Sequence, residues 1–150
     1  MDLTTAILST AKAAQVSGAL LLAVCQHESN NFRLNYSQYD SGSPSYGVCQ
    51  VKEATARMVG FKGKVAELMK PKINVYYAAK YLSYQQDRYG QHNWVKIAAA
   101  YNAGSYIPSK KKPGCPANHK YLLKVQAYLE EELKSKLYCG PMVALTHQLN

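Results

Sequence analysis

Short apolar segments with helical spacing, each ended by turn residues, set the limits on how this chain can fold. Leu3 to about Ala14 places apolar residues three and four positions apart, and after Ser17-Gly18 a second apolar stretch runs into Glu28. A helix with one apolar face must bury that face against a neighbour. The N-terminal part of the chain therefore predicts two short helices that pack together.

The same spacing predicts helices along most of the remaining sequence. They are expected over 53–59, 65–69, Lys72 to Tyr89, Asn93 to Gly104, and Asn118 to Leu137. The segment 105–117 holds three Pro and is expected to be an exposed loop. Only residues 35–50, rich in Ser, Gly and Tyr, have no helical period, which leaves room for at most a small irregular β-hairpin. The predicted fold class is mainly α.

The composition fits one folded domain. The chain has 150 residues, of which 47% are apolar and 18% are charged. This is enough for one hydrophobic core, and it excludes a disordered chain. We therefore expect residues 1–150 to form a single domain that works as a monomer without a cofactor.

The chain is strongly basic, with a net charge of +9 from 18 Lys and Arg against nine Asp and Glu. Such a charge favours approach to a polyanion, which could be nucleic acid, a membrane surface or an anionic cell wall. A solvated basic surface without a dedicated partner is the plainer alternative, above all for the run Lys110-Lys111-Lys112. A basic helical nucleic-acid-binding module stays an alternative class, because charge does not choose between polyanions.

The N-terminal segment lacks the pattern of an export signal. Residue 2 is Asp where a signal peptide has a basic region, and the longest apolar run, Ala19 to Cys25, is seven residues. A membrane span needs about 20 apolar residues. We therefore expect no membrane partner, and synthesis in a cytoplasm without an encoded route out.

Four cysteines, at positions 25, 49, 115 and 139, permit two disulfides in three connectivities. In a chain without an export signal, free and partly buried thiols are the first expectation. A bridge between Cys115 and Cys139 is disfavoured, because an unbroken helix between them spans about 28 Å while residues 115–118 reach back at most about 14 Å. A bridge between Cys25 and Cys49 stays open.

Glu28 is the first candidate for chemistry, because it ends an apolar helix and a polar loop follows it. Burial by the packed helix and the negative end of the helix dipole both favour the neutral carboxyl group. A carboxyl group that stays protonated near neutral pH can act as a general acid. By position alone, a solvated Glu near a helix end is the more common explanation.

Four short blocks stand out in sequence order. The first is His27-Glu28-Ser29-Asn30-Asn31-Phe32, and the second is Ser45-Tyr46-Gly47-Val48-Cys49-Gln50-Val51. The third joins Ile73-Asn74-Val75, Ala79-Lys80-Tyr81-Leu82 and Arg88-Tyr89-Gly90, and the fourth is Ala99-Ala100-Tyr101-Asn102-Ala103-Gly104. Together they resemble the soluble lytic transglycosylase family over roughly residues 25 to 130, and four blocks in order make a specific signal.

The resemblance implies a lysozyme-like helical fold and cleavage of the β-1,4 bond between N-acetylmuramic acid and N-acetylglucosamine in peptidoglycan. Carried over by position, Glu28 matches the catalytic acid. The other matched positions hold the sugar or position the acid and the substrate, and they are Ser37, Tyr46, Gly47, Gln50, Tyr101 and Asn102.

The sequence departs from the family pattern in two places. The loop between Glu28 and Gln50 is a few residues longer than usual, which leaves Ser43 as a rival to Ser37. Cys49 and Lys52 stand where Met is common, which predicts a cleft wall of different shape and charge.

A hydrolytic glycosidase needs two carboxylates flanking the bond, and acids are scarce here. Between Glu28 and Glu53 the sequence has only Asp40. A single acid suffices if the substrate supplies the nucleophile, with Glu28 protonating the leaving oxygen and the muramic acid 6-hydroxyl attacking C1. The product is then a 1,6-anhydro sugar. We therefore expect a lytic transglycosylase, with a hydrolytic muramidase using Asp40 or a held water as the alternative.

Tyrosines and metal-binding residues complete the candidates. Most of the 13 Tyr are expected in packing, and those kept as cleft lining are Tyr36, Tyr39, Tyr46 and Tyr106. No metal is expected, because His27-Glu28 lacks the second His of an H-E-x-x-H helix. A wall-degrading domain without an export signal fits a phage endolysin, and peptidoglycan glycan strands are its expected partner.

Overall fold

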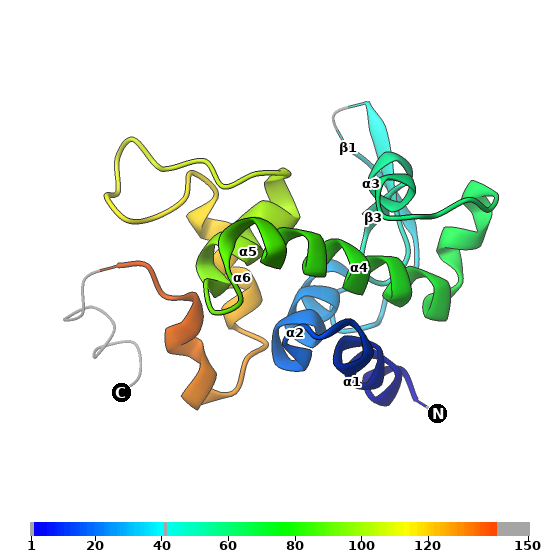
Figure 1. The fold of residues 1–150 in the computed structure, drawn as a ribbon, viewed down its shortest axis with the longest axis horizontal. Helices are drawn as coiled ribbons and strands as arrows, with labels where there is room; N and C mark the ends of the chain where they lie inside the picture. The colour runs from blue at the N-terminus through cyan, green and yellow to red at the C-terminus, as the bar shows by residue number, and fades with distance from the viewer. Residues whose placement is uncertain (1, 41, 141–150) are drawn as a thin grey trace. The chain divides into compact units, whose positions relative to one another are not determined.

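The computed structural model describes residues 2–40 and 42–140, and it is mainly helical (Figure 1). In chain order, the elements are α1 (Leu3–Ala14), α2 (Gly18–Glu28), β1 (Ser37–Asp40), β2 (Ser43–Tyr46), β3 (Val51–Lys52), α3 (Glu53–Met58), η1 (Val65–Met69), α4 (Pro71–Tyr89), α5 (Trp94–Ala103), α6 (His119–Gln126) and η2 (Glu131–Leu137). The three strands form one antiparallel sheet in the order β1-β2-β3. Helices with one small sheet confirm the predicted fold class.

The chain divides into two compact units, Met1–Tyr84 and Gln85–Asn150. The first unit holds α1, α2, the sheet, α3, η1 and most of α4. The second unit holds the C-terminal end of α4 together with α5, α6 and η2. The expectation that residues 1–150 form one domain stays a prediction.

Helices α1 and α2 begin at side-chain caps. The Asp2 carboxylate accepts a hydrogen bond from the Thr5 N–H at 2.7 Å, and Ser17 Oγ accepts one from the Leu20 N–H at 3.1 Å. Each cap satisfies a backbone donor that the first turn of a helix leaves without a partner. Most of the apolar side chains of α2 are buried, so the helix that ends in Glu28 is fixed in the core of the first unit.

The sheet occupies the segment in which the sequence predicted at most a hairpin. β1 and β2 form that hairpin, with Ser37 paired to Tyr46 and Asp40 paired to Ser43. The short strand β3 then pairs with β2 and leads directly into α3. The predicted hairpin is confirmed, and β3, which no sequence pattern indicated, extends it into a three-stranded sheet.

Helix α4 begins at Pro71, which suits the first helical position because it has no N–H to leave unpaired. The inward face of the helix consists of small or branched apolar residues at helical spacing, each at most 1% exposed: Val75, Ala78, Ala79 and Leu82. The helix that the sequence predicted from about Lys72 to Tyr89 is therefore confirmed.

In the second unit, polar side chains of α4 close the end of α5. Gln85 is fully buried, and its Nε2 donates to the carbonyl oxygens of Ala100 at 3.3 Å and Gly104 at 3.1 Å. Arg88 donates to Gly104 O at 2.8 Å and to Gln85 Oε1 at 2.9 Å. Ala100 O also accepts from the Gly104 N–H, so these bonds supply the partners of the Gly104 carbonyl at the C-cap and add a second donor to Ala100 O.

The predicted C-terminal helix needs a correction. The sequence predicted an unbroken helix from Asn118 to Leu137, but α6 ends at Gln126 and the chain continues as the 3₁₀ helix η2. Gln126 is buried and its Nε2 donates to Lys134 O at 2.7 Å, which holds the chain folded back across the break. Asn118 also does not cap α6 through its side chain, which instead donates to Asn102 Oδ1 at 2.9 Å.

The cysteines form two disulfides, Cys25–Cys49 and Cys115–Cys139. The expectation of free thiols is therefore wrong, and so is the argument against a bridge between Cys115 and Cys139. That argument assumed an unbroken helix. Because the chain reverses after Gln126, the two Cα atoms come within 5.1 Å of each other. The bridge that the sequence left open, between Cys25 and Cys49, is formed.

Candidate active site

Glu28 is the last residue of α2 and is partly buried. Burial raises the pKa of Glu28 to about 7, because removing a carboxylate from water disfavours its charged form. This is the direction expected for a carboxyl group at the end of an apolar helix. Near neutral pH both forms of Glu28 are populated, so the side chain can donate a proton and also accept one.

The chain leaves α2 through a tight loop. Ser29 is fully buried, and its Oγ donates to Cys25 O at 2.7 Å and accepts from the Phe32 N–H at 2.8 Å. Asn30, Asn31 and Phe32 all have positive φ, between 51° and 65°. Left-handed backbone is unfavourable for residues other than glycine, and such strain concentrates at functional sites. The Ser29 bonds hold this strained loop in one shape.

A disulfide ties α2 to the turn that follows β2. Cys25 lies three residues before Glu28, and Cys49 directly precedes Gln50. Both cysteines are fully buried, with their Cα atoms 4.2 Å apart. The end of α2 that carries Glu28 is therefore joined covalently to the second sequence block.

Gln50 closes the turn after β2. Its Nε2 donates to Tyr36 O at 2.9 Å and to Gly47 O at 2.8 Å, and its backbone has a φ of 50°. Its Oε1 is buried and accepts no hydrogen bond from the part of the chain that the structure describes. A buried acceptor without a partner is costly, so this oxygen is suited to a donor on a bound molecule, such as a sugar hydroxyl.

Asn74 holds the same turn from α4. It is fully buried, its Oδ1 accepts from the Cys49 N–H at 2.8 Å, and its Nδ2 donates to Tyr46 O at 2.6 Å and Leu68 O at 2.8 Å. Gly47, with a φ of 78°, is required here because an added Cβ would lie 2.8 Å from Leu68 O and closer still to Asn74 Nδ2. No role was predicted for Asn74 from the sequence. Its signals were its place in the third sequence block and an amide within an apolar helical stripe.

The hairpin register separates the two candidate serines. Ser37 is exposed and pairs with Tyr46, at the end of the hairpin that leads into the Gln50 turn. Ser43 lies at the opposite end, and its Oγ accepts from Lys52 Nζ at 3.1 Å. The backbone therefore brings Ser37, Tyr46 and the Gln50 turn together and leaves Ser43 apart from them.

Asp40 pairs with Ser43, three residues along β1 from Ser37. At about 3.3 Å per residue, its backbone lies about 10 Å further along the strand than that of Ser37. The side chains of Asp40 and Tyr39 lie outside the described part of the structure. Their predicted roles, as a second carboxylate and as cleft lining, stay predictions.

Tyr101 and Asn102 lie on α5, in the second unit. Tyr101 is 7% exposed, so only a small part of its side chain reaches the surface. Asn102 is exposed, and its Oδ1 accepts from Asn118 Nδ2 at 2.9 Å. Their placement beside Glu28 stays a prediction.

The tyrosines that were predicted to line a cleft fall in both units. Tyr36 and Tyr46 belong to the Gln50 turn, where Tyr36 O accepts from both Gln50 Nε2 and the Gly47 N–H. Tyr106 belongs to the second unit and packs edge to face against Tyr89, with ring centroids 6.5 Å apart. The role of Tyr36 as an acceptor for the turn was not foreseen, because it uses the backbone rather than the ring.

The described residues hold neither a metal-ligand cluster nor a membrane-spanning helix. Within 2–40 and 42–140, no three His, Cys, Asp or Glu side chains come together as metal ligands would. In the same ranges, none of the helices combines the length and the apolar character that crossing a bilayer requires.

Comparison with known proteins identifies the family. Residues 5–121 match the family described as the transglycosylase SLT domain. Because the match spans most of the chain, the protein belongs to this family. The resemblance seen in the four sequence blocks is thereby confirmed, and the fold is that of the lysozyme-like superfamily.

Two curated relatives, both called Protein IpgF, are similar to this chain. The one from Shigella sonnei is 34% identical over 101 residues, and the one from Shigella flexneri is 31% identical over 99 residues. Each alignment covers 65% of this chain and 63% of the relative. The chain thus spans less than two thirds of the length of the relatives that it matches.

Two solved structures share the fold. The lytic transglycosylase Slt of Pseudomonas aeruginosa, solved as an inactive mutant, has a TM-score of 0.60 and 17% identity over 90% of this chain. The 70 kDa soluble lytic transglycosylase of Escherichia coli has a TM-score of 0.56 and 18% identity over 89% of this chain. The matches cover only 22% and 20% of those larger chains, and at this identity they establish the fold alone.

Proposed function

We propose that this protein is a peptidoglycan lytic transglycosylase. It cleaves the β-1,4 bond between N-acetylmuramic acid and N-acetylglucosamine and leaves 1,6-anhydro ends. The observation that carries the proposal is Glu28, a carboxyl group at the end of an apolar helix whose pKa burial raises to about 7. Membership of the SLT domain family supports the substrate class.

The reaction uses one carboxyl group twice. In the first step, protonated Glu28 donates its proton to the glycosidic oxygen as the bond from that oxygen to C1 of muramic acid breaks. In the second step, the Glu28 carboxylate takes the proton of the 6-hydroxyl as that oxygen bonds to C1. The carboxyl group ends as it began, and no water is consumed. A pKa near the working pH serves both transfers.

The residues around the Gln50 turn hold the sugar in this proposal. Gln50 Oε1 is a buried acceptor suited to a sugar hydroxyl, and Ser37 and Tyr46 pair at the end of the hairpin that leads into the Gln50 turn. Fixed polar groups that are aligned before the reaction stabilise developing charge better than mobile ones. We assign Tyr101 and Asn102 to positioning of the acid and the substrate, as the family motif implies.

Hydrolysis by a second carboxylate is the less supported chemistry. The register puts the Asp40 backbone at the far end of the hairpin from the Gln50 turn. A retaining glycosidase needs its two carboxyl groups only about 5 Å apart, and an inverting one about 6.5 to 9.5 Å apart. None of the residues of the Gln50 turn, 46–50, is acidic, which supports the single-acid reaction.

The two disulfides support a place of action outside a reducing cytoplasm, because such bonds persist in oxidising surroundings. We propose that the protein acts at the cell wall as a monomer, and that its charge of +9 favours the anionic wall rather than nucleic acid. A phage endolysin that reaches the wall after synthesis in a host cytoplasm is the origin that we propose.

Mass spectrometry of the muropeptides released by wild type and by Glu28→Gln tests the proposal. Wild type should release products with anhydro ends, each lighter by one water than a hydrolysed product. Glu28→Gln keeps the shape of the side chain but cannot donate the proton, so turnover should fall by roughly 10² to 10⁴. Reducing ends would point to a hydrolase, and full turnover by the variant would refute the role of Glu28.

A further inference from the structure

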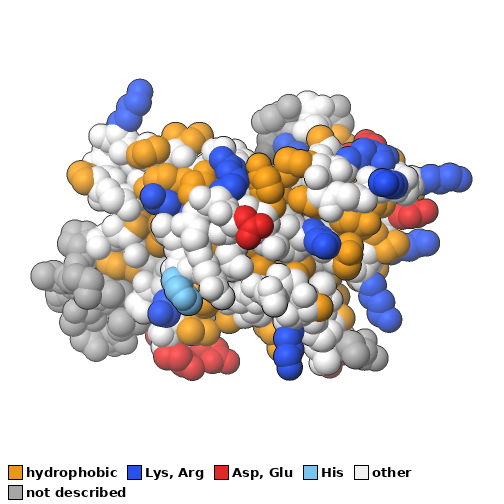
Figure 2. Space-filling view, viewed as in Figure 1, with side chains coloured by type: hydrophobic (Ala, Val, Ile, Leu, Met, Phe, Trp, Pro, Cys, Tyr) orange, Lys and Arg blue, Asp and Glu red, His pale blue; other side chains and the backbone are white. Residues whose placement is uncertain are grey.

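An open recess lies in the first unit, lined by the connection from α3 to η1 and by the start of α4. Its volume is about 520 Å³, and its main side chains are Phe61, Lys62, Glu67, Lys72, Tyr76 and Tyr77. None of the residues that line it belongs to the predicted active site. Figure 2 shows Lys and Arg side chains gathered over this part of the molecule, at the right of the view, around exposed apolar atoms. We call it the α3–α4 recess.

The inner surface of the α3–α4 recess is aromatic. Phe61 packs edge to face against Tyr77, with ring centroids 5.1 Å apart, and Tyr77 packs in the same way against Tyr76 at 4.9 Å. Phe61 is 4% exposed, whereas Tyr76 is 47% exposed. The cluster therefore fixes its inner rings and presents an outer ring to a bound molecule.

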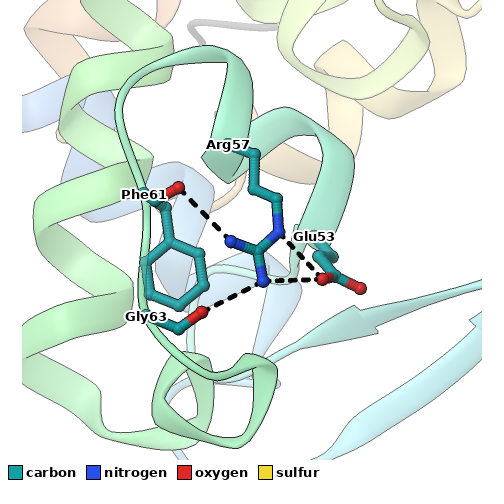
Figure 3. A network of polar contacts seen from close by, with 4 residues as sticks. All are labelled: Glu53, Arg57, Phe61 and Gly63. Carbon is teal, nitrogen blue, oxygen red and sulfur yellow. Dashed lines mark hydrogen bonds and ion pairs between the residues drawn. The ribbon is translucent and has the colours of Figure 1, made fainter.

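The wall of the recess is held in place by Arg57 (Figure 3). Its guanidinium donates to Gly63 O at 3.0 Å and Phe61 O at 3.5 Å, and it lies over the Phe61 ring at 5.0 Å from the centroid. Glu53 orients the guanidinium through an ion pair at 2.8 Å. A recess that is shaped before binding loses less entropy when a ligand enters.

Basic residues outnumber acidic ones in and beside the recess. Lys62 and Lys72 line the recess, Lys64 and Lys70 adjoin the lining residues in the chain, and Glu67 is the one acidic residue of the lining. Among residues 2–40 and 42–140, none of these four lysines forms a salt bridge. Lys72 also stands in the first turn of α4, which carries no acidic residue, so the helix dipole adds to the positive field. An anionic ligand would be attracted by this positive field.

We propose that the α3–α4 recess binds the carboxylate-bearing peptide stem of peptidoglycan. The stem is a short peptide with several free carboxylates and with aliphatic side chains. Its carboxylates would bind Lys62 and Lys72, and its aliphatic groups would cover Tyr76 and Tyr77. A glycan strand without stems has no carboxylates to pair with these lysines. A peptide stem has both carboxylates for the lysines and aliphatic groups for the rings. This inference rests on the proposed function, since it assigns a second contact to the same wall polymer.

Calorimetric titration with a free stem tetrapeptide tests the recess directly. Lys62→Glu/Lys72→Glu should weaken binding by about tenfold or more, and Tyr76→Ala by about fivefold. Glu67→Gln should tighten binding about twofold, because it removes the opposing charge. Lys120→Glu/Lys124→Glu, two exposed lysines of α6, makes the same change in net charge elsewhere and should leave binding within about twofold. Each variant is checked for an unchanged thermal midpoint.

The ligands provide the second control. The tetrapeptide with its carboxylates amidated should lose binding, and glycan strands freed of stems by an amidase should bind no better to wild type than to Lys62→Glu/Lys72→Glu. On stem-bearing strands that variant should raise KM and keep kcat, with no change on stem-free strands. Equal binding of the amidated peptide, or an equal loss in the α6 control pair, would overturn the proposal.

The titration separates this proposal from the proposed function. Glu28→Gln should bind the tetrapeptide as wild type does, because Glu28 does not line the recess. If Glu28→Gln kept full turnover, the assignment of Glu28 as the acid would fail. The titration would still test whether the recess binds the tetrapeptide. If the recess variants bound as wild type, the recess proposal would fail while the loss of turnover in Glu28→Gln stood.

Discussion

The two disulfides close loops of the same length, but they differ in burial and in the segments that they join. Cys25–Cys49 and Cys115–Cys139 each join residues 24 positions apart, so loop closure contributes about 3.5 kcal/mol to stability in both cases. In the first unit, both cysteines are fully buried between the end of α2 and the Gln50 turn. In the second unit, Cys139 is partly exposed and joins the segment after η2 to the loop before α6.

Equal loop-closure entropy does not give the two bridges equal functional importance. The first bridge stands within three residues of Glu28 and one residue of Gln50, so its loss lets two parts of the candidate site move apart. The second bridge stands among residues with no predicted catalytic role. Matched substitutions in the two units can therefore show which contacts only stabilise the fold and which also position the candidate site.

The largest expected difference comes from removing each bridge. Cys25→Ala/Cys49→Ala should lower the free energy of unfolding by about 4 to 5 kcal/mol, because a buried cavity adds to the loop entropy, and turnover should fall at least about tenfold. Cys115→Ala/Cys139→Ala should cost about 3 kcal/mol and change turnover less than about twofold. Denaturant unfolding and muropeptide release below the unfolding transition measure both. Equal losses of turnover would break the comparison.

Buried amides give the next pair, with Asn74 in the first unit and Gln85 in the second. Both are fully buried and bond to backbone groups of a neighbouring segment. Asn74→Ala leaves a donor and two acceptors unpaired and should cost about 3 kcal/mol, while Gln85→Ala should cost about 2 kcal/mol. Urea unfolding measures the cost. Only Asn74→Ala should also lower turnover at temperatures where both variants are folded, and a matching loss in Gln85→Ala would contradict this.

Two carboxyl groups with raised pKa values form the third pair. Burial raises the pKa of Glu28 from 4.5 to about 7, whereas a hydrogen bond with Glu132 raises the pKa of exposed Glu130. Between pH 4.5 and about pH 7, Glu28 is protonated in the folded protein and ionised in the unfolded chain. The free energy of unfolding therefore falls as pH rises through this range. Glu28→Gln removes this dependence and should gain roughly 2 kcal/mol over wild type between about pH 5 and about pH 8.

The control for this pair is Glu130→Gln. Its pH dependence of stability should differ little from that of wild type, because solvent screens the interaction of an exposed group and leaves it a small effect on stability. Wild-type turnover should also fall as pH rises above about 7, since the general acid loses its proton. Unfolding curves and pH–rate profiles measure the two effects. A flat profile across this range would exclude Glu28 as the acid.

The smallest difference is expected from one exposed ion pair in each unit. Arg57–Glu53 and Lys134–Glu131 have similar distances, 2.8 Å and 2.7 Å, and both lie at the surface. Lys134→Ala should cost less than about 0.5 kcal/mol. Arg57→Ala should cost about 1 kcal/mol, because Arg57 also bonds to the Phe61 and Gly63 carbonyls. Thermal unfolding measures both, and equal costs would show that these carbonyl bonds add nothing.

The sequence predicted most of the helices correctly because the signals for them are local. Apolar spacing, the turn residues Ser17-Gly18 and the breaks at Gly90 and Gly104 all lie within or beside the segments that they describe. Glu28 was found for the same reason, since an apolar helix ends there and a polar loop follows. The family blocks then named the other candidates by position.

Chain reversals were predicted less well because their causes are distant in sequence. The segment around Ala127 has no Gly or Pro, so nothing local announces the end of α6. The break is held by a bond from Gln126 to Lys134 O, which forms only once the chain has turned. Because this reversal was not predicted, Cys115 and Cys139 were expected to lie too far apart for a disulfide.

Most of the helices, their apolar faces and the acid at the end of α2 follow from the sequence alone, because each depends on side chains within a few turns of one another. The pairing of the cysteines, the placement of Ser37 rather than Ser43 beside the Gln50 turn, and the clamp from Asn74 follow only from the tertiary structure. These depend on strand register and on buried hydrogen bonds between distant residues. Such bonds acquire their full value only when the fold has excluded water from them.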